Sequence, residues 1–180
     1  MNKTAWVIIA CAGLFMAGCA SAPARPEWIT KGAGAFSKEK KVLYGVGIAE
    51  GITSEALSRT TADNRAIADI SRQLSVMSTS LMRDYMSSTN ATEEEKAAGE
   101  QYVESTVKTF ASNTISGVKI VDRYRDGAVS YSLASLNIDD LKAMTDQVNA
   151  LSRQVRDYIK ANADKAFATL NAEQERINQY

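Results

Sequence analysis

Three closely spaced glycines, Gly45, Gly47 and Gly51, are the first residues of this sequence that suggest chemistry. Glycine-rich turns cradle phosphates when the motif GxGxxG follows the end of a strand and opens a helix. Here the third glycine comes one residue too late, and the first two lie inside the alternating run 42–49, which has the period of a strand. The sequence also lacks an acidic residue at the end of a second β-α unit, which a dinucleotide-binding site would need. The sequence therefore favours a packing role, in which a face of small residues lets a helix backbone approach closely.

The second candidate site is the cysteine at position 19. Lys3 precedes an apolar run over 5–16, which is too short for a membrane-spanning helix and has the plan of an export signal. The tetrapeptide Met16-Ala17-Gly18-Cys19 then has the lipobox pattern of bacterial lipoproteins. This pattern predicts cleavage between Gly18 and Cys19, a diacylglyceryl group on the thiol and acylation, for example with palmitate, of the new amino group. The alternative is a cleaved secretory signal with an incidental cysteine.

Such an anchor would decide where the protein resides. Each buried methylene contributes about 0.8 kcal/mol, so two or more acyl chains hold a protein firmly on a membrane. Ala20 follows the cysteine in place of the aspartate that commonly marks retention in the inner membrane of enteric bacteria. We therefore expect the outer membrane, with the folded domain in the periplasm or on the cell surface.

Composition excludes several classes of site. The chain has no histidine, Cys11 leaves with the signal and Cys19 becomes a thioether, which excludes a zinc site and a histidine-based triad. No catalytic residue, metal ligand or cofactor is expected, and no enzymatic activity. Removing 18 of the 180 residues leaves 162, with 20 of the 21 basic side chains against 21 acidic ones. No basic stripe predicts binding to nucleic acid.

The segment after the cysteine and the first helix come next along the chain. Residues 19–40 read as a tether, in which Trp28 either packs on the domain or sits at the membrane interface. Thr53 or Ser54 is expected to cap a helix with one apolar stripe: Ile67, Ile70, Leu74, Met77, Leu81 and Tyr85. Its pairs Arg59 with Asp63 and Arg65 with Asp69 read as a solvated face.

A second helical stretch and a hairpin follow. Thr92 and Glu95 have capping-box spacing, and the buried side of this stretch is expected to be Val103, Val107 and Phe110. Asp126-Gly127 fits a two-residue type I′ turn, which pairs Tyr124 with Val129 and Asp122 with Tyr131. Asp122 then lies on an otherwise apolar face, where an acid either marks a site or accepts a hydrogen bond near an edge.

A long C-terminal helix is expected over 138–180, capped by Asn137 or Asp139. About 39 of these 43 residues, at about 1.5 Å each, span about 58 Å, more than a small sheet can cover. An exposed apolar stripe of this kind usually meets a partner. We therefore expect self-association through its C-terminal half: Leu151, Val155, Phe167, Leu170 and Ile177. The alternative is that this stripe folds back on the first helix.

Together these features resemble a family of small outer-membrane lipoproteins typified by the twenty-kilodalton membrane-associated lipoprotein of Helicobacter, with the flagellar lipoprotein FlgP as a relative. The resemblance covers about residues 16–140 and rests on five features: the lipobox cysteine, the opening Pro26-Glu27-Trp28-Ile29, the strand YGVGIA, the helix ADNRAIADISRQLSV and the hairpin ISGVKIVDRYRDGAVSYSLASL. It implies a compact α+β domain carried on a lipid, no enzymatic activity, and a role as a surface antigen or in an envelope or flagellar assembly.

The predicted fold is α+β in the order β-α-β-β, with a helix packed on a three-stranded antiparallel sheet and then a long C-terminal helix. The predicted segments are a lipoprotein signal peptide (1–18), a lipidated N-terminus and tether (19–40), an α+β domain (41–137) and the C-terminal helix (138–180). The predicted function is a structural or protein-interaction role of a lipid-anchored envelope protein, by self-association or with an envelope partner. The alternative is a lipoprotein that binds a small ligand between helix and sheet.

Overall fold

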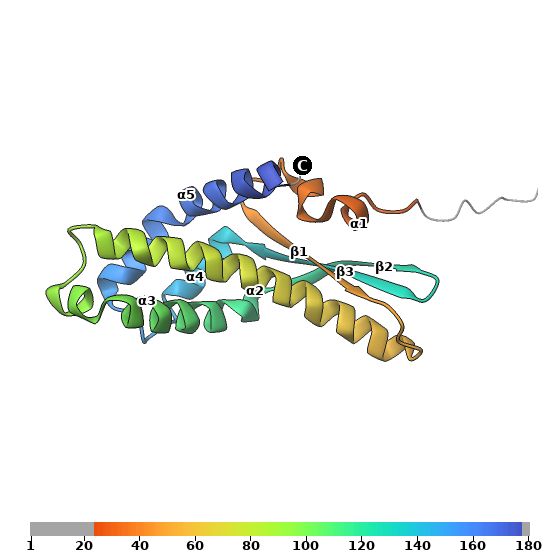
Figure 1. The fold of residues 1–180 in the computed structure, drawn as a ribbon, viewed down its shortest axis with the longest axis horizontal. Coiled ribbons are helices and arrows are strands. Elements are labelled where there is room, and N and C mark those ends of the chain that lie inside the picture. The colour runs from red at the N-terminus through yellow and green to blue at the C-terminus, as the bar shows by residue number, and fades with distance from the viewer. Residues whose placement is uncertain (1–23, 178–180) are drawn as a thin grey trace, which may run out of the picture.

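The computed structural model describes residues 24–177 of the chain. Three strands form one antiparallel sheet in the order β1-β3-β2: β1 (Val42–Ala49), β2 (Lys119–Asp126) and β3 (Val129–Asn137). Between β1 and β2 the chain forms three elements: α2 (Glu55–Ser87), α3 (Glu93–Thr114) and the short η2 (Ile115–Gly117). The predicted fold class, an α+β arrangement with a helix packed on a three-stranded antiparallel sheet, is confirmed (Figure 1).

α2 connects the two ends of the molecule. Ser54 caps it as predicted, because its Oγ accepts a hydrogen bond from the amide of Leu57. The helix has 33 residues and is therefore about 50 Å long. Its first half lies across the sheet, and its second half continues past the sheet to the other helices (Figure 1). One stripe stays buried along the helix: Ala62, Ala66, Ile70, Leu74, Met77, Leu81 and Tyr85.

α3 begins with the predicted capping box and packs against α2. The Thr92 hydroxyl accepts a hydrogen bond from the amide of Glu95, and the Glu95 carboxylate accepts one from the amide of Thr92. On its inner side Val103 and Phe110 are buried, and Val107 is half-buried. The buried side predicted for this helix is confirmed.

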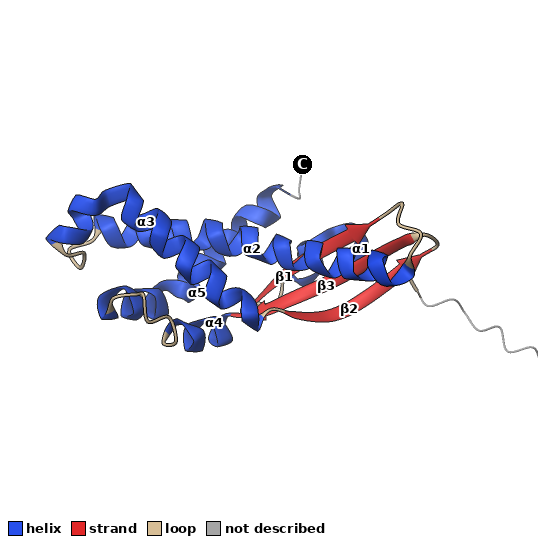
Figure 2. Cartoon of the chain, turned by 90° about the horizontal axis from the view of Figure 1, so that it is seen from below, coloured by secondary structure: helices blue, strands red, loops and turns tan. Residues whose placement is uncertain are grey.

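The C-terminal region departs from the prediction. Asn137 caps a helix, as expected, but the single helix predicted over 138–180 is wrong: it is divided into α4 (Ile138–Thr145) and α5 (Arg153–Ile177) (Figure 2). Val148 and Leu151 in the connecting segment are buried in the core. Ser152 then starts a new helix, because its hydroxyl accepts a hydrogen bond from the amide of Val155. The chain therefore turns here, and α5 packs back on α2 and α4.

The hairpin between β2 and β3 differs from the prediction in register. Asp126 pairs with Val129 and Tyr124 with Tyr131, so the two-residue loop is Gly127-Ala128 and the predicted pairing of Tyr124 with Val129 is wrong. A type I′ turn needs positive φ at both loop residues, and among the described residues only glycines have positive φ. Gly127, with φ of 56°, takes the first loop position, as glycine does in a type II′ turn.

The face of the sheet opposite α2 is covered by residues 24–36, which we call the strap (Figures 1 and 2). The strap contains α1 (Trp28–Lys31) and the 3-10 helix η1 (Gly32–Phe36). Trp28 is only 4% exposed, and Phe36 stacks on Tyr44 of β1 with ring centres 4.0 Å apart. Of the two places predicted for Trp28, the structure therefore shows packing on the domain. Residues 24–36 of the tether predicted over 19–40 thus belong to the folded domain.

Candidate functional site

The glycine face of β1 is closed by α2. A Cβ atom at Gly45 would lie 2.5 Å from the carbonyl oxygen of Ala66, and one at Gly47 would clash with the carbonyl oxygen of Ala62 and the amide nitrogen of Ala66. Only glycine therefore lets the helix backbone approach the strand this closely. The packing role predicted for these glycines is confirmed, since the backbone of α2 fills the space that a phosphate would need.

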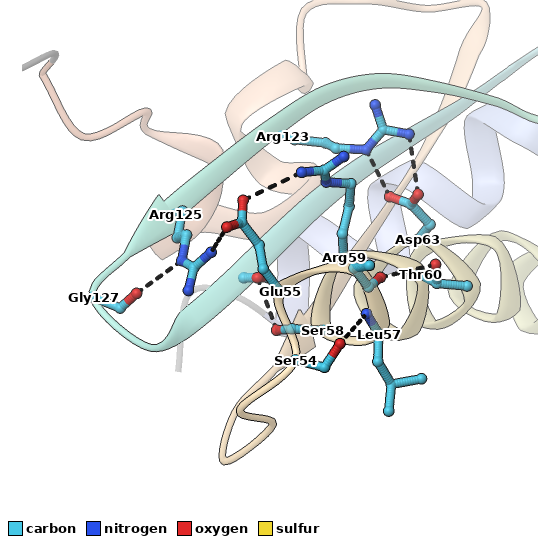
Figure 3. A network of polar contacts seen from close by, with 12 residues as sticks. Ser54, Glu55, Leu57, Ser58, Arg59, Thr60, Asp63, Arg123, Arg125 and Gly127 are labelled. Atoms are coloured by element: carbon cyan, nitrogen blue, oxygen red, sulfur yellow. Dashed lines mark hydrogen bonds and ion pairs between the residues drawn. The ribbon is translucent and has the colours of Figure 1, made fainter.

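A polar seam fastens the hairpin to the first turns of α2 (Figure 3). Arg123 of β2 donates to both carboxylate oxygens of Asp63 at 3.0 Å, and Ser132 of β3 donates to Oδ1 of Asp63 at 2.6 Å. The Ser58 hydroxyl donates to that of Ser130 at 2.8 Å. Burial would raise the pKa of Asp63, but the hydrogen bonds from Arg123 and Ser132 outweigh it and hold that pKa below its usual value. Asp63 thus ties β2 and β3 to α2.

At the open end of this seam, Glu55 lies between two arginines (Figure 3). Its carboxylate accepts a hydrogen bond of 3.3 Å from Arg59 and forms an ion pair of 3.0 Å with Arg125. Beside them lies a shallow pocket of about 200 Å³. The expected pair of Arg59 with Asp63 is not formed, because Asp63 is bonded to Arg123 and Arg59 turns to Glu55. The three arginines that line this pocket thus share two carboxylates, those of Glu55 and Asp63.

The edges of the sheet are protected against a further strand. Three side chains of α2 bond to the backbone of β1: Arg65 to the carbonyl of Ile48, Asp69 to the amide of Val46 at 3.2 Å, and Gln73 to the carbonyl of Tyr44 at 2.8 Å. Arg65 and Asp69 therefore bond to the sheet, and not to each other as expected. On β2 a bulge at Val121 interrupts the ladder. Blocked and bulged edges oppose strand addition.

The buried carboxylate of Glu95 joins three helices at the end of the molecule away from the hairpin. It accepts hydrogen bonds from the hydroxyls of Tyr85 on α2 (2.7 Å), Tyr102 on α3 (2.9 Å) and Ser152 at the start of α5 (3.2 Å). Burial would raise the pKa of Glu95, but these bonds and the one from the amide of Thr92 lower it below the usual value. Burial and the adjacent carboxylate raise the pKa of both tyrosines. The cluster keeps Glu95 charged and the phenols neutral, as a structural joint needs.

The residues predicted to mediate self-association lie mostly inside the chain. Leu151, Val155 and Phe167 are at most 4% exposed, and Leu170 is half-buried against the same core. Ile177 ends α5. Because α5 folds back along α2, Leu151, Val155 and Phe167 belong to the core of one molecule. Folding back on the first helix, the alternative, therefore describes the structure, and self-association stays a prediction.

Two grooves flank the second half of α2. The groove between α2 and α5 has a volume of about 400 Å³ and is lined by Met77, Leu81 and Leu170 with a rim that includes Asp84 and Lys165. The groove between α2 and α3 has about 500 Å³ and a more charged lining, with Arg83, Glu100 and Lys108. Both lie between helices, whereas the alternative function places a ligand between helix and sheet, where the backbone of α2 lies directly against Gly47.

Gly18 and Cys19, the residues predicted for signal cleavage and lipidation, lie outside the described residues. Within 24–177, no group of three or more His, Cys, Asp or Glu side chains is placed to hold a metal ion. No helix in that part of the chain is both long and apolar enough to cross a membrane. Comparison of the chain with protein-family models, curated proteins and solved structures finds no match. The family resemblance stays a prediction.

Proposed function

We propose that this protein is a non-enzymatic lipoprotein of the bacterial envelope, anchored in the outer membrane by lipid on Cys19, with a structural or protein-interaction role. The observation that carries the proposal is the sequence Met16-Ala17-Gly18-Cys19 at the end of an apolar export signal. The start of the strap, only a few residues beyond the cysteine, supports a short connection between lipid and folded domain.

The shape of the domain supports a role in which one end is held and the other is presented. The chain enters the described domain beside the hairpin, at the sheet end, and the helices extend to the opposite end along α2 (Figure 1). α2 alone spans about 50 Å. The partner is then an envelope protein, in a surface or flagellar assembly, that contacts the grooved helical end at a distance from the membrane.

The hydrogen bonding of two carboxylates, those of Asp63 and Glu95, supports a role without catalysis. Asp63 and Glu95 each accept at least three hydrogen bonds, and both have a pKa below the usual value. A general acid or base needs a pKa near the working pH and access to a substrate. Neither group meets these requirements.

The alternative function is the binding of a small apolar ligand. One observation favours it: the groove between α2 and α5, at about 400 Å³, has the size of a ligand site and an apolar floor that includes Met77 and Leu81. A ligand there would raise the melting temperature of the delipidated domain. It would not require the lipid anchor.

Fractionation of the two cysteine variants tests the proposed function. The Cys19→Ser protein should be absent from the outer-membrane fraction, or it should remain uncleaved with its signal attached. Cys11→Ser is the matched control, because position 11 lies in the signal and is removed on cleavage. The lipid anchor would be refuted if the wild-type protein carried no lipid and if it and both variants were recovered in the soluble envelope fraction.

A further inference from the structure

The register of the hairpin brings four polar side chains to one face of the sheet. Arg123 pairs with Ser132, and Arg125 pairs with Ser130. Because successive side chains of a strand point to opposite faces, these four side chains lie on the same face. It is the face that α2 crosses, since Arg123 bonds there to the helix.

The first turns of α2 complete a pocket on this face. Glu55 and Arg59 are four positions apart and therefore lie on one side of the helix. The pocket has a volume of about 200 Å³, and three of the residues that line it are arginines, whereas only Glu55 is acidic. Three guanidinium groups against one carboxylate give the lining a net charge of +2. Arginine forks match the oxygens of phosphates and carboxylates, so the pocket suits an anion with several oxygens.

Each of these arginines keeps an amino group for a further partner. In the hydrogen bonds of residues 24–177, Nη1 of Arg59, Nη1 of Arg123 and Nη2 of Arg125 do not take part. The three side chains are 44–56% exposed, so these groups are within reach of a solute. The hydroxyl of Ser130 accepts a hydrogen bond from Ser58, which leaves its own proton as one more donor in the lining.

The two carboxylates that share these arginines are held differently. The side chain of Asp63 is 19% exposed and accepts hydrogen bonds from Arg123 and Ser132. The side chain of Glu55 is 62% exposed and lies between two arginines (Figure 3). Exposed ion pairs are weak. An anion of higher charge can therefore take the place of Glu55 while Asp63 stays bonded.

We propose that this pocket is an anion site that binds a phosphate group. Arg59, Arg123 and Arg125 donate hydrogen bonds to the phosphate oxygens. Glu55 is the counter-ion that the phosphate displaces, because a phosphate monoester at pH 7 carries about −1.5 to −2 charges and three acceptor oxygens. Free phosphate and the headgroup of a phospholipid are two sources of this group. The site goes beyond the proposed function and does not depend on the lipid anchor.

Titration calorimetry of the full-length protein with inorganic phosphate, at constant ionic strength, tests the site. The wild type should bind one phosphate per chain. Arg125→Gln should weaken this binding at least about tenfold, because it removes hydrogen bonds from a charged donor. Arg72→Gln is the matched control: Arg72 also forms an exposed ion pair, with Asp69, but lies outside the pocket. It should leave phosphate binding unchanged.

The Glu55→Gln protein separates an anion site from ion pairs that only stabilise the fold. If phosphate displaces this carboxylate, removal of its charge should tighten phosphate binding by up to about fivefold, a gain that a damaged fold cannot produce. Glu93→Gln is the matched control. Glu93 begins α3 and pairs with Lys96, as Glu55 begins α2 and pairs with Arg59. This control should bind phosphate as the wild type does.

Glycerophosphoglycerol, the water-soluble headgroup of phosphatidylglycerol, distinguishes the two sources of phosphate. Tighter binding of inorganic phosphate makes the free ion the ligand, and tighter binding of the phosphodiester makes it a lipid headgroup. The proposal is overturned if neither compound binds, or if Arg125→Gln and Glu55→Gln both leave the affinity unchanged. The cysteine variants test the lipid anchor separately, so failure of the anion site leaves the anchor standing.

Discussion

The indole nitrogen of Trp28 donates a hydrogen bond of 2.9 Å to Oδ2 of Asp122, across 94 positions of the chain. The sequence alone leaves the role of each residue undecided. Trp28 lies in a segment predicted to be a tether, and Asp122 is an acid on a predicted apolar face. Their contact explains both, because the acid accepts a hydrogen bond at the edge strand and the indole closes the outer face of the sheet. The strap is thereby fixed to β2.

Removal of this contact should loosen the strap. Trp28→Ala should lower the free energy of unfolding by about 3–5 kcal/mol, the usual cost of deleting a buried aromatic side chain. Trp28→Phe keeps most of the packing and loses one hydrogen bond to a charged group, so it should cost about 1.5–3 kcal/mol. Urea titrations of the unlipidated chain, residues 20–180, measure both values. A negligible effect of Trp28→Ala would mean that the strap is not part of the fold.

Because β1 and α2 approach closely at Gly47, even a small side chain at this position should destabilise the fold. Gly47→Ala should lower the free energy of unfolding by about 1–3 kcal/mol through overpacking. The new Cβ would meet backbone atoms of α2, which cannot move aside as the end of a side chain can. Gly117→Ala is the matched control: there the new Cβ meets the flexible end of Met144, which can move aside. Thermal melts of both variants, with and without nucleotide, measure the difference. A melt of the wild type that nucleotide raises would contradict the packing role.

Local signals made much of the fold predictable. The alternation of Val42–Ala49, the cap at Ser54 and the capping box at Thr92 each depend on residues within a few positions, and all three are found as predicted. The type of turn at Gly127 was not predictable with the same accuracy. The two-residue loop can be Asp126-Gly127 or Gly127-Ala128. The structure has the second, in which only the glycine needs a positive φ.

The clusters that depend on tertiary contact could not be predicted. Glu95 is recognisable as a capping residue, but its bond to Ser152 joins positions 57 apart and exists only because the chain turns before α5. Ser152, a residue suited to capping, is a local signal for the break between α4 and α5. The continuous spacing of apolar residues favoured a single helix more strongly than this signal favoured a break. Once α5 turns back, Leu151, Val155 and Phe167 of the stripe that reads as an exposed interface lie in the core.

The Glu95 cluster predicts loss of stability in acid. The pKa of Glu95 is lowered in the folded protein, so its contribution is fully present above the ordinary pKa of about 4.5 and is lost as the pH falls through the lower folded value. Glu95→Gln should be less stable at pH 7 by about 1.5–3 kcal/mol and should lose less stability in acid than the wild type. Denaturant midpoints at a series of pH values measure this. Glu94→Gln, at the exposed neighbouring position, should retain the wild-type profile.

The C-terminal core predicts destabilisation without any change in oligomeric state. Phe167→Ala should lower the free energy of unfolding by about 3–5 kcal/mol, because the ring is 1% exposed. Ala168→Glu, at the exposed next position, should be tolerated. Sedimentation and melting of the unlipidated domain separate the possibilities. An oligomer that Phe167→Ala dissociates into folded monomers would show that Phe167 lies in an interface between molecules and not in the core.

The covalent state of the mature N-terminus tests the central claim most directly. Trypsin does not cleave between Arg25 and Pro26, so the predicted N-terminal peptide runs from Cys19 to Lys31. Mass spectrometry of protein from the outer-membrane fraction should find this peptide with a diacylglyceryl group on the cysteine and an acylated amino terminus, and no peptide from residues 1–18. An unmodified peptide that begins at Cys19, or a chain that keeps its signal, would contradict the account.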